Sequence, residues 1–307
     1  MICYNGEGNM QYFLLTGADG NLGGKLTKLI VDETQYGVIA VTSFPERLPA
    51  MMKRESISNV DKIISLSSDD MFNMDLINIC IIGCVHFAFS RPIYPNKDIA
   101  SSLDYSMKAF EKMVCSGIQN CIYISSQSVY GDTPEIRKEM TPPAPNSIYA
   151  MAKYAGEKLF ELCYKDRDDL QHSIIRLDNV IQSQNLVSTL CRKAKDGINL
   201  ELVGGKQVFS YIDVSEVSNA IYALLNSRCK WKNIYNVGPN EMRVSLMDVA
   251  KAVQVVAEKR GKNIEISLKA DDRELWAGMN TMLFYNDTGW KPKHDLLTMV
   301  ENVYNTI

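Results

Sequence analysis

Short apolar segments alternate with helix-like segments through residues 1–180, and this alternation limits the fold more than any other feature of the chain. Apolar runs at 12–17 and 37–43 are typical of strands, and residues 21–33 between them have helical spacing. The same patterns predict strands at 61–66, within 77–89, at 120–126 and at 172–177, and helices at 101–117 and 147–166. The sequence therefore predicts an α/β fold with a doubly wound parallel sheet covered by helices on both faces.

A glycine-rich turn, LLTGADGNLGGKL, joins the first strand to the first helix. Gly17, Gly20 and Gly23 allow a tight turn and a close backbone approach to a phosphate. The free N–H groups and positive dipole end of the following helix favour the same anion. A plain strand–helix turn is the alternative, but the flanking strand and helix favour dinucleotide binding.

The end of the second strand bears on the choice between NAD and NADP. An acid at this position usually holds the adenosine ribose hydroxyls of NAD. Here the candidates are Thr42 and Ser43, which are neutral, and Arg47 lies nearby. The sequence leaves the choice between the two cofactors open.

Tyr149 and Lys153 stand four residues apart in the helix predicted at 147–166, so both side chains share one helix face. A phenol has a pKa near 10, and a nearby positive charge would favour its ionised form. Tyr149 could then exchange protons near neutral pH. An amphipathic helix that merely carries Tyr and Lys is the alternative, but the glycine turn and the hydroxyl-rich strand end YISSQSVYGD favour a catalytic pair.

Composition excludes several other classes of function. The chain has 307 residues, a net charge of −3 and no apolar run long enough to span a membrane, so nucleic-acid and membrane partners are not expected. Its eight cysteines form no CxxC pair and its three histidines lie far apart, so we expect no metal site and a reducing, cytoplasmic setting. Residues 1–10 are expected to be a polar tail without a secretion signal, and whether Met1 or Met10 is the true start is open.

Seven short motifs together resemble one family. The chain resembles an extended short-chain dehydrogenase/reductase of the NAD-dependent epimerase/dehydratase group, which modifies nucleotide sugars. The resemblance covers nearly the whole chain, with TGxxGxxG at 16–23, VHFAF at 85–89, SSQSVYG at 125–131, YxxxK at 149–153, IIRLDNV at 174–180, YNVG at 235–238 and TGWKP at 288–292.

The resemblance implies roles for individual residues. Ser126 would hydrogen-bond the reacting sugar oxygen, Tyr149 would exchange the proton, and Lys153 would hold the cofactor ribose and tune Tyr149. It implies cofactor contacts at Gly17, Asp19, Gly20, Asn21, Leu22, Gly23, Thr42, Ser43, Phe87, Ala88, Tyr149, Lys153 and Leu177. It implies substrate contacts at Ser126, Gln127, Asn179, Asn185 and Arg273. The two asparagines could equally end a strand and cap a helix, Arg273 could be a solvated surface residue, and Ser125 and Ser128 are expected to make local hydrogen bonds.

The resemblance also implies a division of the chain. We expect an NAD(P)-binding Rossmann domain at 11–180 with 206–228 returning to it, and a smaller mixed α/β substrate-binding cap made of 181–205 and 229–307. The helices at 101–117 and 147–166 often pair two subunits in the family, so a homodimer is expected.

The residues after Ser126 bear on the reaction. Family dehydratases carry an Asp-Glu pair there, because eliminating water needs an extra acid and base. Gln127 and Ser128 occupy those positions, which disfavours dehydration. The predicted function is therefore 4-epimerisation of a nucleotide sugar, or reduction or oxidation of a keto or hydroxyl sugar.

Two positions depart from the family pattern. Phe209 stands where a second phosphate-binding Arg is usual, and NVIQSQN lacks the Gly-Pro that commonly follows its first Asn. Both lie on the nucleotide side of the expected substrate pocket. They keep two alternatives open, an oxidoreductase acting on a non-nucleotide carbonyl or alcohol and a non-catalytic dinucleotide-binding sensor.

Overall fold

A seven-stranded parallel sheet organises the larger part of the molecule. The computed structural model describes residues 10–181, 186–272 and 274–307. The strand order is β3-β2-β1-β4-β5-β6-β11, and every neighbouring pair is parallel. The strands are β1 (Tyr12–Thr16), β2 (Gly37–Thr42), β3 (Ile63–Ser67), β4 (Ile81–His86), β5 (Cys121–Ser126), β6 (His172–Leu177) and β11 (Ile234–Val237). The doubly wound parallel sheet predicted from the alternating pattern is confirmed.

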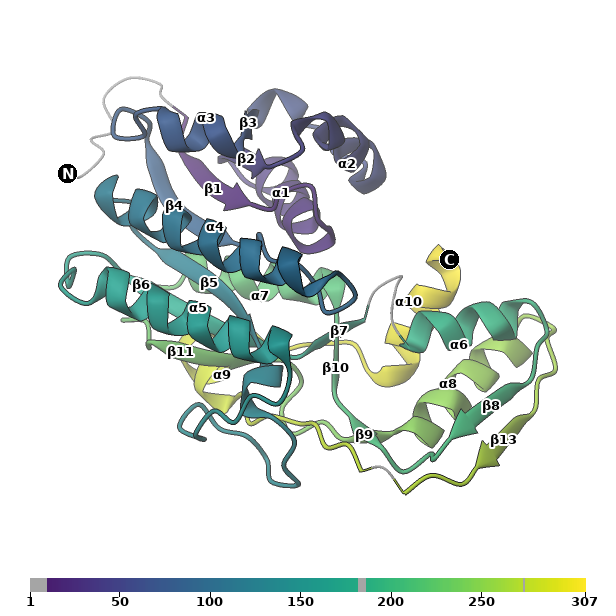
Figure 1. The fold of residues 1–307 in the computed structure, drawn as a ribbon. Helices are drawn as coiled ribbons and strands as arrows, with labels where there is room; N and C mark the ends of the chain where they lie inside the picture. Colours follow the sequence, from purple (N-terminus) through teal and green to yellow (C-terminus); the bar gives the residue numbers. More distant parts are fainter. Residues whose placement is uncertain (1–9, 182–185, 273) are drawn as a thin grey trace.

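Helices cover both faces of this sheet (Figure 1). Helices α1 (Asn21–Glu33) and α7 (Val214–Leu225) pack against each other on one face, and α4 (Asn96–Cys115) and α5 (Ile148–Tyr164) pack on the other. Each face has its own apolar core, because parallel strands buried on both sides carry apolar residues throughout. Helix α7 lies within the segment 206–228, whose assignment to the Rossmann domain stays a prediction.

Two short helices in the first half have no counterpart in the sequence prediction. They are α2 (Leu48–Glu55), which has Pro49 in its first turn, and α3 (Ser68–Asn73), which begins at a capping box between Ser67 and Asp70. With eight and six residues, both are too short for helical periodicity to stand out.

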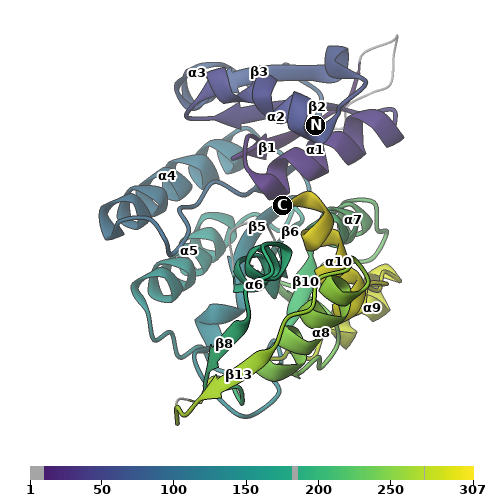
Figure 2. The ribbon, with the colours of Figure 1, turned by 90° about the vertical axis from the view of Figure 1, so that its right-hand side faces the viewer.

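The remaining elements form a smaller lobe beside the sheet (Figure 2). Helices α6 (Leu186–Lys195), α8 (Leu246–Glu258) and α10 (Leu296–Thr306) share a third apolar core with β8 (Leu200–Val203), which pairs with β13 (Ile266–Lys269). Two more strand pairs are β7 (Asn179–Ile181) with β10 (Tyr211–Asp213) and β9 (Val208–Phe209) with β12 (Val244–Ser245). Strands β7 and β10 lie between the sheet and the smaller lobe (Figure 1).

The chain returns to the large sheet after residue 229. Strand β11 forms its edge beside β6, and α9 (Met282–Thr288) packs against β11. The sequence assigned this stretch to the cap, because YNVG is too short to separate an edge strand from a turn. The exact boundaries of the two domains stay a prediction.

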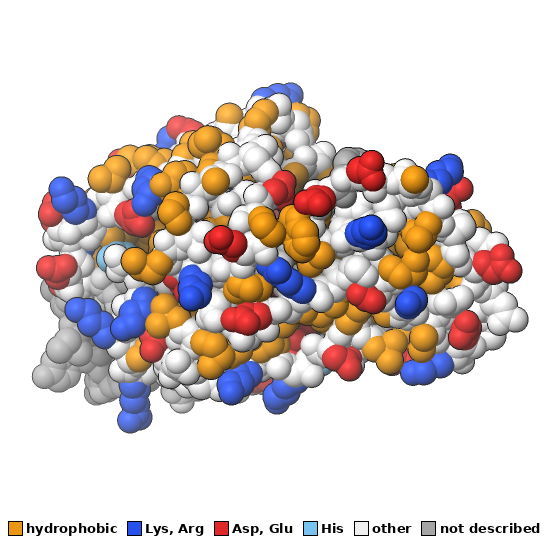
Figure 3. Space-filling view, turned by 90° about the horizontal axis from the view of Figure 1, so that it is seen from below, with side chains coloured by type: hydrophobic (Ala, Val, Ile, Leu, Met, Phe, Trp, Pro, Cys, Tyr) orange, Lys and Arg blue, Asp and Glu red, His pale blue; other side chains and the backbone are white. Residues whose placement is uncertain are grey.

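The surface carries charges of both signs. On the face shown in Figure 3, Lys and Arg side chains are interspersed with Asp and Glu, and apolar side chains lie between them. Within the described ranges, no helix is long and apolar enough to cross a membrane.

Candidate active site

The carboxyl ends of the strands open into a cavity of about 1370 Å³ that reaches across to the smaller lobe. Register brings these ends together, since Thr16 pairs with Val41 and His86, and Ser126 pairs with Leu177. The candidate residues that line the cavity are Gly17, Asp19, Gly20, Asn21, Leu22, Gly23, Thr42, Ser43, Phe87, Ala88, Ser126, Gln127, Tyr149, Lys153, Leu177 and Asn179. Asn185 and Arg273 lie outside the described residues.

The glycine turn has no room for side chains. Gly17 has a φ of +68°, and a Cβ there would lie 2.9 Å from the Ala88 nitrogen. A Cβ on Gly23 would lie 2.5 Å from the Gly17 oxygen, so the first turn of α1 packs directly on the loop. Gly20 precedes α1 without a side-chain cap, which leaves first-turn N–H groups for an anion. This cradle fits the diphosphate of a dinucleotide.

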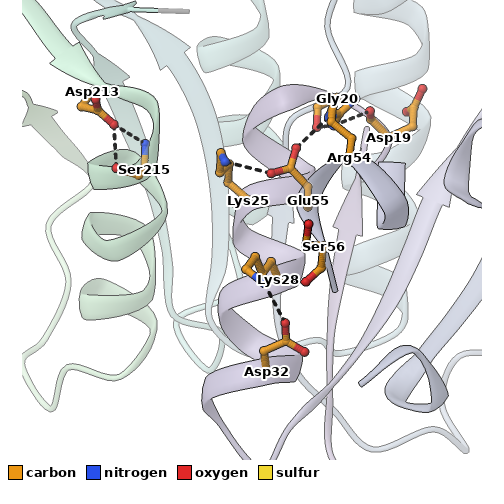
Figure 4. A network of polar contacts seen from close by, with 10 residues as sticks. All are labelled: Asp19, Gly20, Lys25, Lys28, Asp32, Arg54, Glu55, Ser56, Asp213 and Ser215. Atoms are coloured by element: carbon orange, nitrogen blue, oxygen red, sulfur yellow. Dashed lines mark hydrogen bonds and ion pairs between the residues drawn. The ribbon is translucent and has the colours of Figure 1, made fainter. Parts of the chain in front are cut away.

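A second contact holds the glycine turn from α2 (Figure 4). The Arg54 Nη2 donates to the carbonyl oxygens of Asp19 and Gly20 at 3.3 and 3.2 Å. Glu55 accepts from the Arg54 Nε at 2.7 Å and pairs with Lys25 at 2.9 Å. These cations hold the pKa of the Glu55 carboxyl below its usual value, although burial opposes them. The loop carbonyls are thus turned toward α2.

Lys153 lies in the wall of the cavity with its ammonium group buried. Its Nζ donates to the Ile124 carbonyl oxygen at 2.8 Å and lies 4.0 Å from the centre of the Phe89 ring. Burial lowers the pKa of Lys153 to about 7, while the charge of Glu157 opposes that change. The ring of Phe89 also meets Tyr149 edge to face at 6.1 Å.

The Tyr149 phenol is buried beside Ser126. Burial raises the pKa of the Tyr149 phenol to about 12, and a hydrogen bond with Ser126 offsets only part of that rise. The lowering of the Tyr149 pKa by Lys153 and an oxidised nicotinamide stays a prediction. Burial thus favours the neutral phenol, whereas positive charge beside it would favour the ionised form that takes a proton.

The three serines at the end of β5 are not equivalent. Ser125 is buried and donates to Glu157 Oε1 at 2.6 Å, beside the buried ion pair of Glu157 with Arg176. Ser128 donates to the Ser126 oxygen at 3.0 Å. Ser126 is thus the serine that faces Tyr149, while Ser125 belongs to the interior.

Gln127 is held at both ends of its amide. Its Nε2 donates to Asp178 Oδ1 at 2.8 Å, and its Oε1 accepts from Arg137 Nη1 at 3.0 Å. Asp178 also accepts from the Ser210 hydroxyl and the Asn179 N–H. Burial raises the pKa of Asp178 to about 6 despite these hydrogen bonds.

Arg137 and Asp178 were not among the predicted site residues. The signal for Asp178 was an acid directly after an apolar strand, in RLDN at 176–179. Arg137 had no such signal, because it lies in an irregular stretch and meets Gln127 only in the folded chain. Such contacts depend on tertiary structure rather than on local spacing.

The part of the cavity beside the smaller lobe carries an aromatic pair. Phe209 stacks on Tyr211 at 5.7 Å with an angle of 15° between the rings, and both line the cavity. The Asn179 amide donates to the Ser210 carbonyl oxygen at 3.1 Å, which ties it to the neighbouring strand. Among the described residues, no group of three or more His, Cys, Asp or Glu side chains gathers as a metal site.

The doubly wound sheet, the glycine cradle and the Tyr–Lys helix define an extended short-chain dehydrogenase/reductase. The chain belongs to the NAD dependent epimerase/dehydratase family, whose sequence profile matches residues 13–238. It is an enzyme of that family.

Several relatives show how broad this similarity is. An uncharacterised UDP-glucose epimerase of Bacillus subtilis is 22% identical over 285 residues, which cover 87% of this chain and 89% of the relative. The UDP-glucose 4-epimerase of Thermotoga maritima, solved with UDP-glucose, superimposes with a TM-score of 0.77 at 19% identity, covering 96% of this chain and 98% of that one. The UDP-glucuronic acid 4-epimerase of Bacillus cereus, solved with UDP-glucuronic acid and NAD, gives 0.80 at 18% identity with the same coverage. At these identities the solved structures support the fold alone.

Proposed function

We propose that this enzyme epimerises a nucleotide sugar at C4 with a bound nicotinamide cofactor. The observation that carries the proposal is the shared cavity, which Ser126, Tyr149 and Lys153 line together with the glycine cradle. The similarity to enzymes described as UDP-glucose and UDP-glucuronic acid 4-epimerases supports the same substrate class.

Three side chains divide the proton chemistry. The Ser126 hydroxyl, already in contact with the Tyr149 phenol, would bind the oxygen of the reacting C4 hydroxyl. Tyr149 would take the proton from that oxygen and return it after the sugar ketone has turned its other face. Lys153 would supply positive charge close to the phenol and bind the cofactor ribose. The nicotinamide, when bound, supplies the hydride acceptor and donor.

Gln127 argues against elimination of water. A dehydratase needs an acid and a base immediately after the catalytic hydroxyl, and the amide of Gln127 can serve as neither. The nearby acid, Asp178, already accepts hydrogen bonds from Gln127, Asn179 and Ser210. Epimerisation, or a single oxidation or reduction, needs no such group.

The cofactor is proposed to be NAD or NADP. The cavity wall at the end of β2 carries Thr42, Ser43 and Arg47, and none of these would repel a 2′-phosphate. Release of the bound cofactor from purified protein and its identification by mass spectrometry separates the two. Retained NAD supports an epimerase that keeps its cofactor, whereas an empty site that prefers NADPH supports a reductase.

A second candidate function rests on Phe209. Without the second phosphate-binding Arg, the cavity could serve a carbonyl or alcohol that lacks a nucleotide. UDP distinguishes the two, because a ligand that binds the folded state raises the melting temperature. A clear rise with UDP supports the nucleotide sugar, and no rise supports the second candidate.

A homodimer through α4 and α5 stays a prediction. These helices pack side by side, and α5 exposes Ile148, Met151 and Leu162. The molar mass from light scattering tests this assembly directly.

The reaction itself is tested with nucleotide sugars. Purified protein is incubated with UDP-glucose, UDP-N-acetylglucosamine or UDP-glucuronic acid, with NAD or NADP added, and the products are followed by NMR. Inversion at C4 by the native chain, lost in Tyr149→Phe, is expected. Cofactor binding without turnover of any of these sugars would contradict the proposal.

A further inference from the structure

The amide of Gln127 lies between two buried charged groups in the cavity wall. Arg137 and Asp178 are each 3% exposed, and Gln127 is 6% exposed. Arg137 donates to the amide oxygen and Asp178 accepts from the amide nitrogen. Because Arg can only donate and a carboxylate can only accept, the two partners fix which end of the amide is nitrogen.

Arg137 has no carboxylate as a direct hydrogen-bond partner among the described residues. Its Nη2 donates to the carbonyl oxygens of Gly131 and Trp276, at 2.7 and 2.5 Å, and its Nη1 donates to Gln127. Asp178 is one of the negative charges that favour the charged form of Arg137. The two charges thus face each other through the Gln127 amide.

Stability does not account for this arrangement. Separated buried charges lose their hydration, and replacing such groups with apolar ones often leaves a protein equally or more stable. Arg137 connects the end of β5 to residues 275–277, which also line the cavity. The position of the network beside Ser126 indicates a role in the reaction.

We propose that Arg137 and Asp178 are positioning residues that hold the Gln127 amide so that its nitrogen binds an oxygen of the sugar next to the reacting carbon. The inference rests on the proposed function, since it places a sugar beside Ser126. The Gln127 nitrogen has two hydrogens, and only Asp178 accepts from it among the described residues. The remaining N–H suits a hydroxyl, keto or acetamido oxygen.

The charge of Asp178 matters to this role. The groups that face it are Arg137, Ser210, Tyr211 and, beyond Gly238, Tyr285. An ionised Asp178 accepts from Gln127 with full charge, and a protonated one accepts more weakly. The sugar contribution to binding should therefore fall as the pH drops below about 6, where Asp178 gains a proton.

Calorimetry with UDP-glucose and UDP, in the presence of NAD, isolates the sugar end. The Kd of UDP divided by the Kd of UDP-glucose reports how much the sugar adds to binding. The Kd of UDP alone reports the binding of the nucleotide. Gln127→Glu keeps the size of the side chain but removes both amide N–H donors, so the ratio should fall about tenfold while UDP affinity stays unchanged. Asp178→Asn should lower the ratio by about threefold to tenfold and remove its decline below pH 6.

Gln119→Glu is the matched control, because it makes the same change outside the cavity. Gln119 is exposed, donates from its amide to the Asp169 carbonyl oxygen at 3.2 Å and has no hydrogen bond with Gln127, Arg137 or Asp178. It should keep the native ratio and the native pH dependence. A native ratio in folded Gln127→Glu and Asp178→Asn would overturn the inference alone. Failure of the native chain to bind either ligand would overturn the proposed function together with it.

Discussion

Two walls of the cavity differ in how far apart their residues lie in the sequence. The proposed cofactor wall is built from the glycine turn, the end of β2 and the Tyr–Lys helix, and its residues stand at fixed spacings within single elements. The proposed substrate wall joins Gln127, Arg137, Asp178 and Phe209 from distant parts of the chain. The first wall is set by local backbone geometry, and the second depends on tertiary contacts. Substitutions on the first wall should therefore impair chemistry or cofactor binding, and those on the second should change substrate choice.

The largest effect is expected at Tyr149. Tyr149→Phe removes the proton-transfer group and should lower kcat by about 10²–10⁴-fold, with cofactor binding retained. Tyr154→Phe is the control, because Tyr154 lies on the same helix but packs beside Val129, Tyr130 and Met279. Stopped-flow or steady-state rates measure the change. Equal loss in both variants would show that the effect comes from the helix rather than the phenol.

The next effect concerns the stability of the substrate wall. Burial raises the pKa of Asp178 to about 6 from 3.8, so the folded state holds this proton more tightly than the unfolded chain does. Its contribution to stability is fully present below pH 3.8 and is lost as the pH rises through 6. At pH 7, Asp178→Asn should raise the free energy of unfolding by about 3 kcal/mol. This gain should disappear near pH 4, where Asp178 is protonated in the folded state. Urea unfolding of both chains at the two pH values measures this difference, and a difference independent of pH would contradict it.

The cofactor wall should respond to a single methyl group. Gly17→Ala places a Cβ 2.9 Å from the Ala88 nitrogen at a φ of +68°, and should weaken NAD or NADP binding about 10–100-fold. Gly117→Ala is the matched control, since Gly117 has a φ of +64° with nothing within 4 Å of its added Cβ. It should cost stability without changing the cofactor Kd. If Gly17→Ala binds NAD or NADP with unchanged affinity, the glycine turn does not need this close packing to hold the cofactor.

The smallest expected effect is a gain in UDP affinity from a substitution on the substrate wall. Phe209→Arg restores the charge that the family pattern has there and should tighten UDP binding about tenfold. Phe44→Arg adds the same charge at the end of β2, at the other end of the cavity, and should leave UDP affinity unchanged. If Phe209→Arg also leaves it unchanged, Phe209 does not lie near the diphosphate.

The difference between the two walls explains which features of the fold and the site the sequence predicted. The sheet and the glycine turn followed from periodicity and spacing, and the family resemblance implied that Ser126, Tyr149 and Lys153 share one site. The edge strand β11 was assigned to the cap because four residues carry too weak a pattern. Arg137 and Asp178 were missed because their partners lie 10 and 51 residues from them in the chain. The burial that raises the pKa of Tyr149 depends on packing that the helix spacing does not report.

The central claim is that one site removes a hydride from a sugar carbon and returns it to the opposite face. A UDP-hexose labelled with deuterium at C4 tests this claim most directly, with the products followed by NMR. We predict that the C4 epimer forms and keeps its deuterium, and that Tyr149→Phe forms none. Loss of the label to free cofactor, or no epimer from the native chain with cofactor bound, would contradict the account.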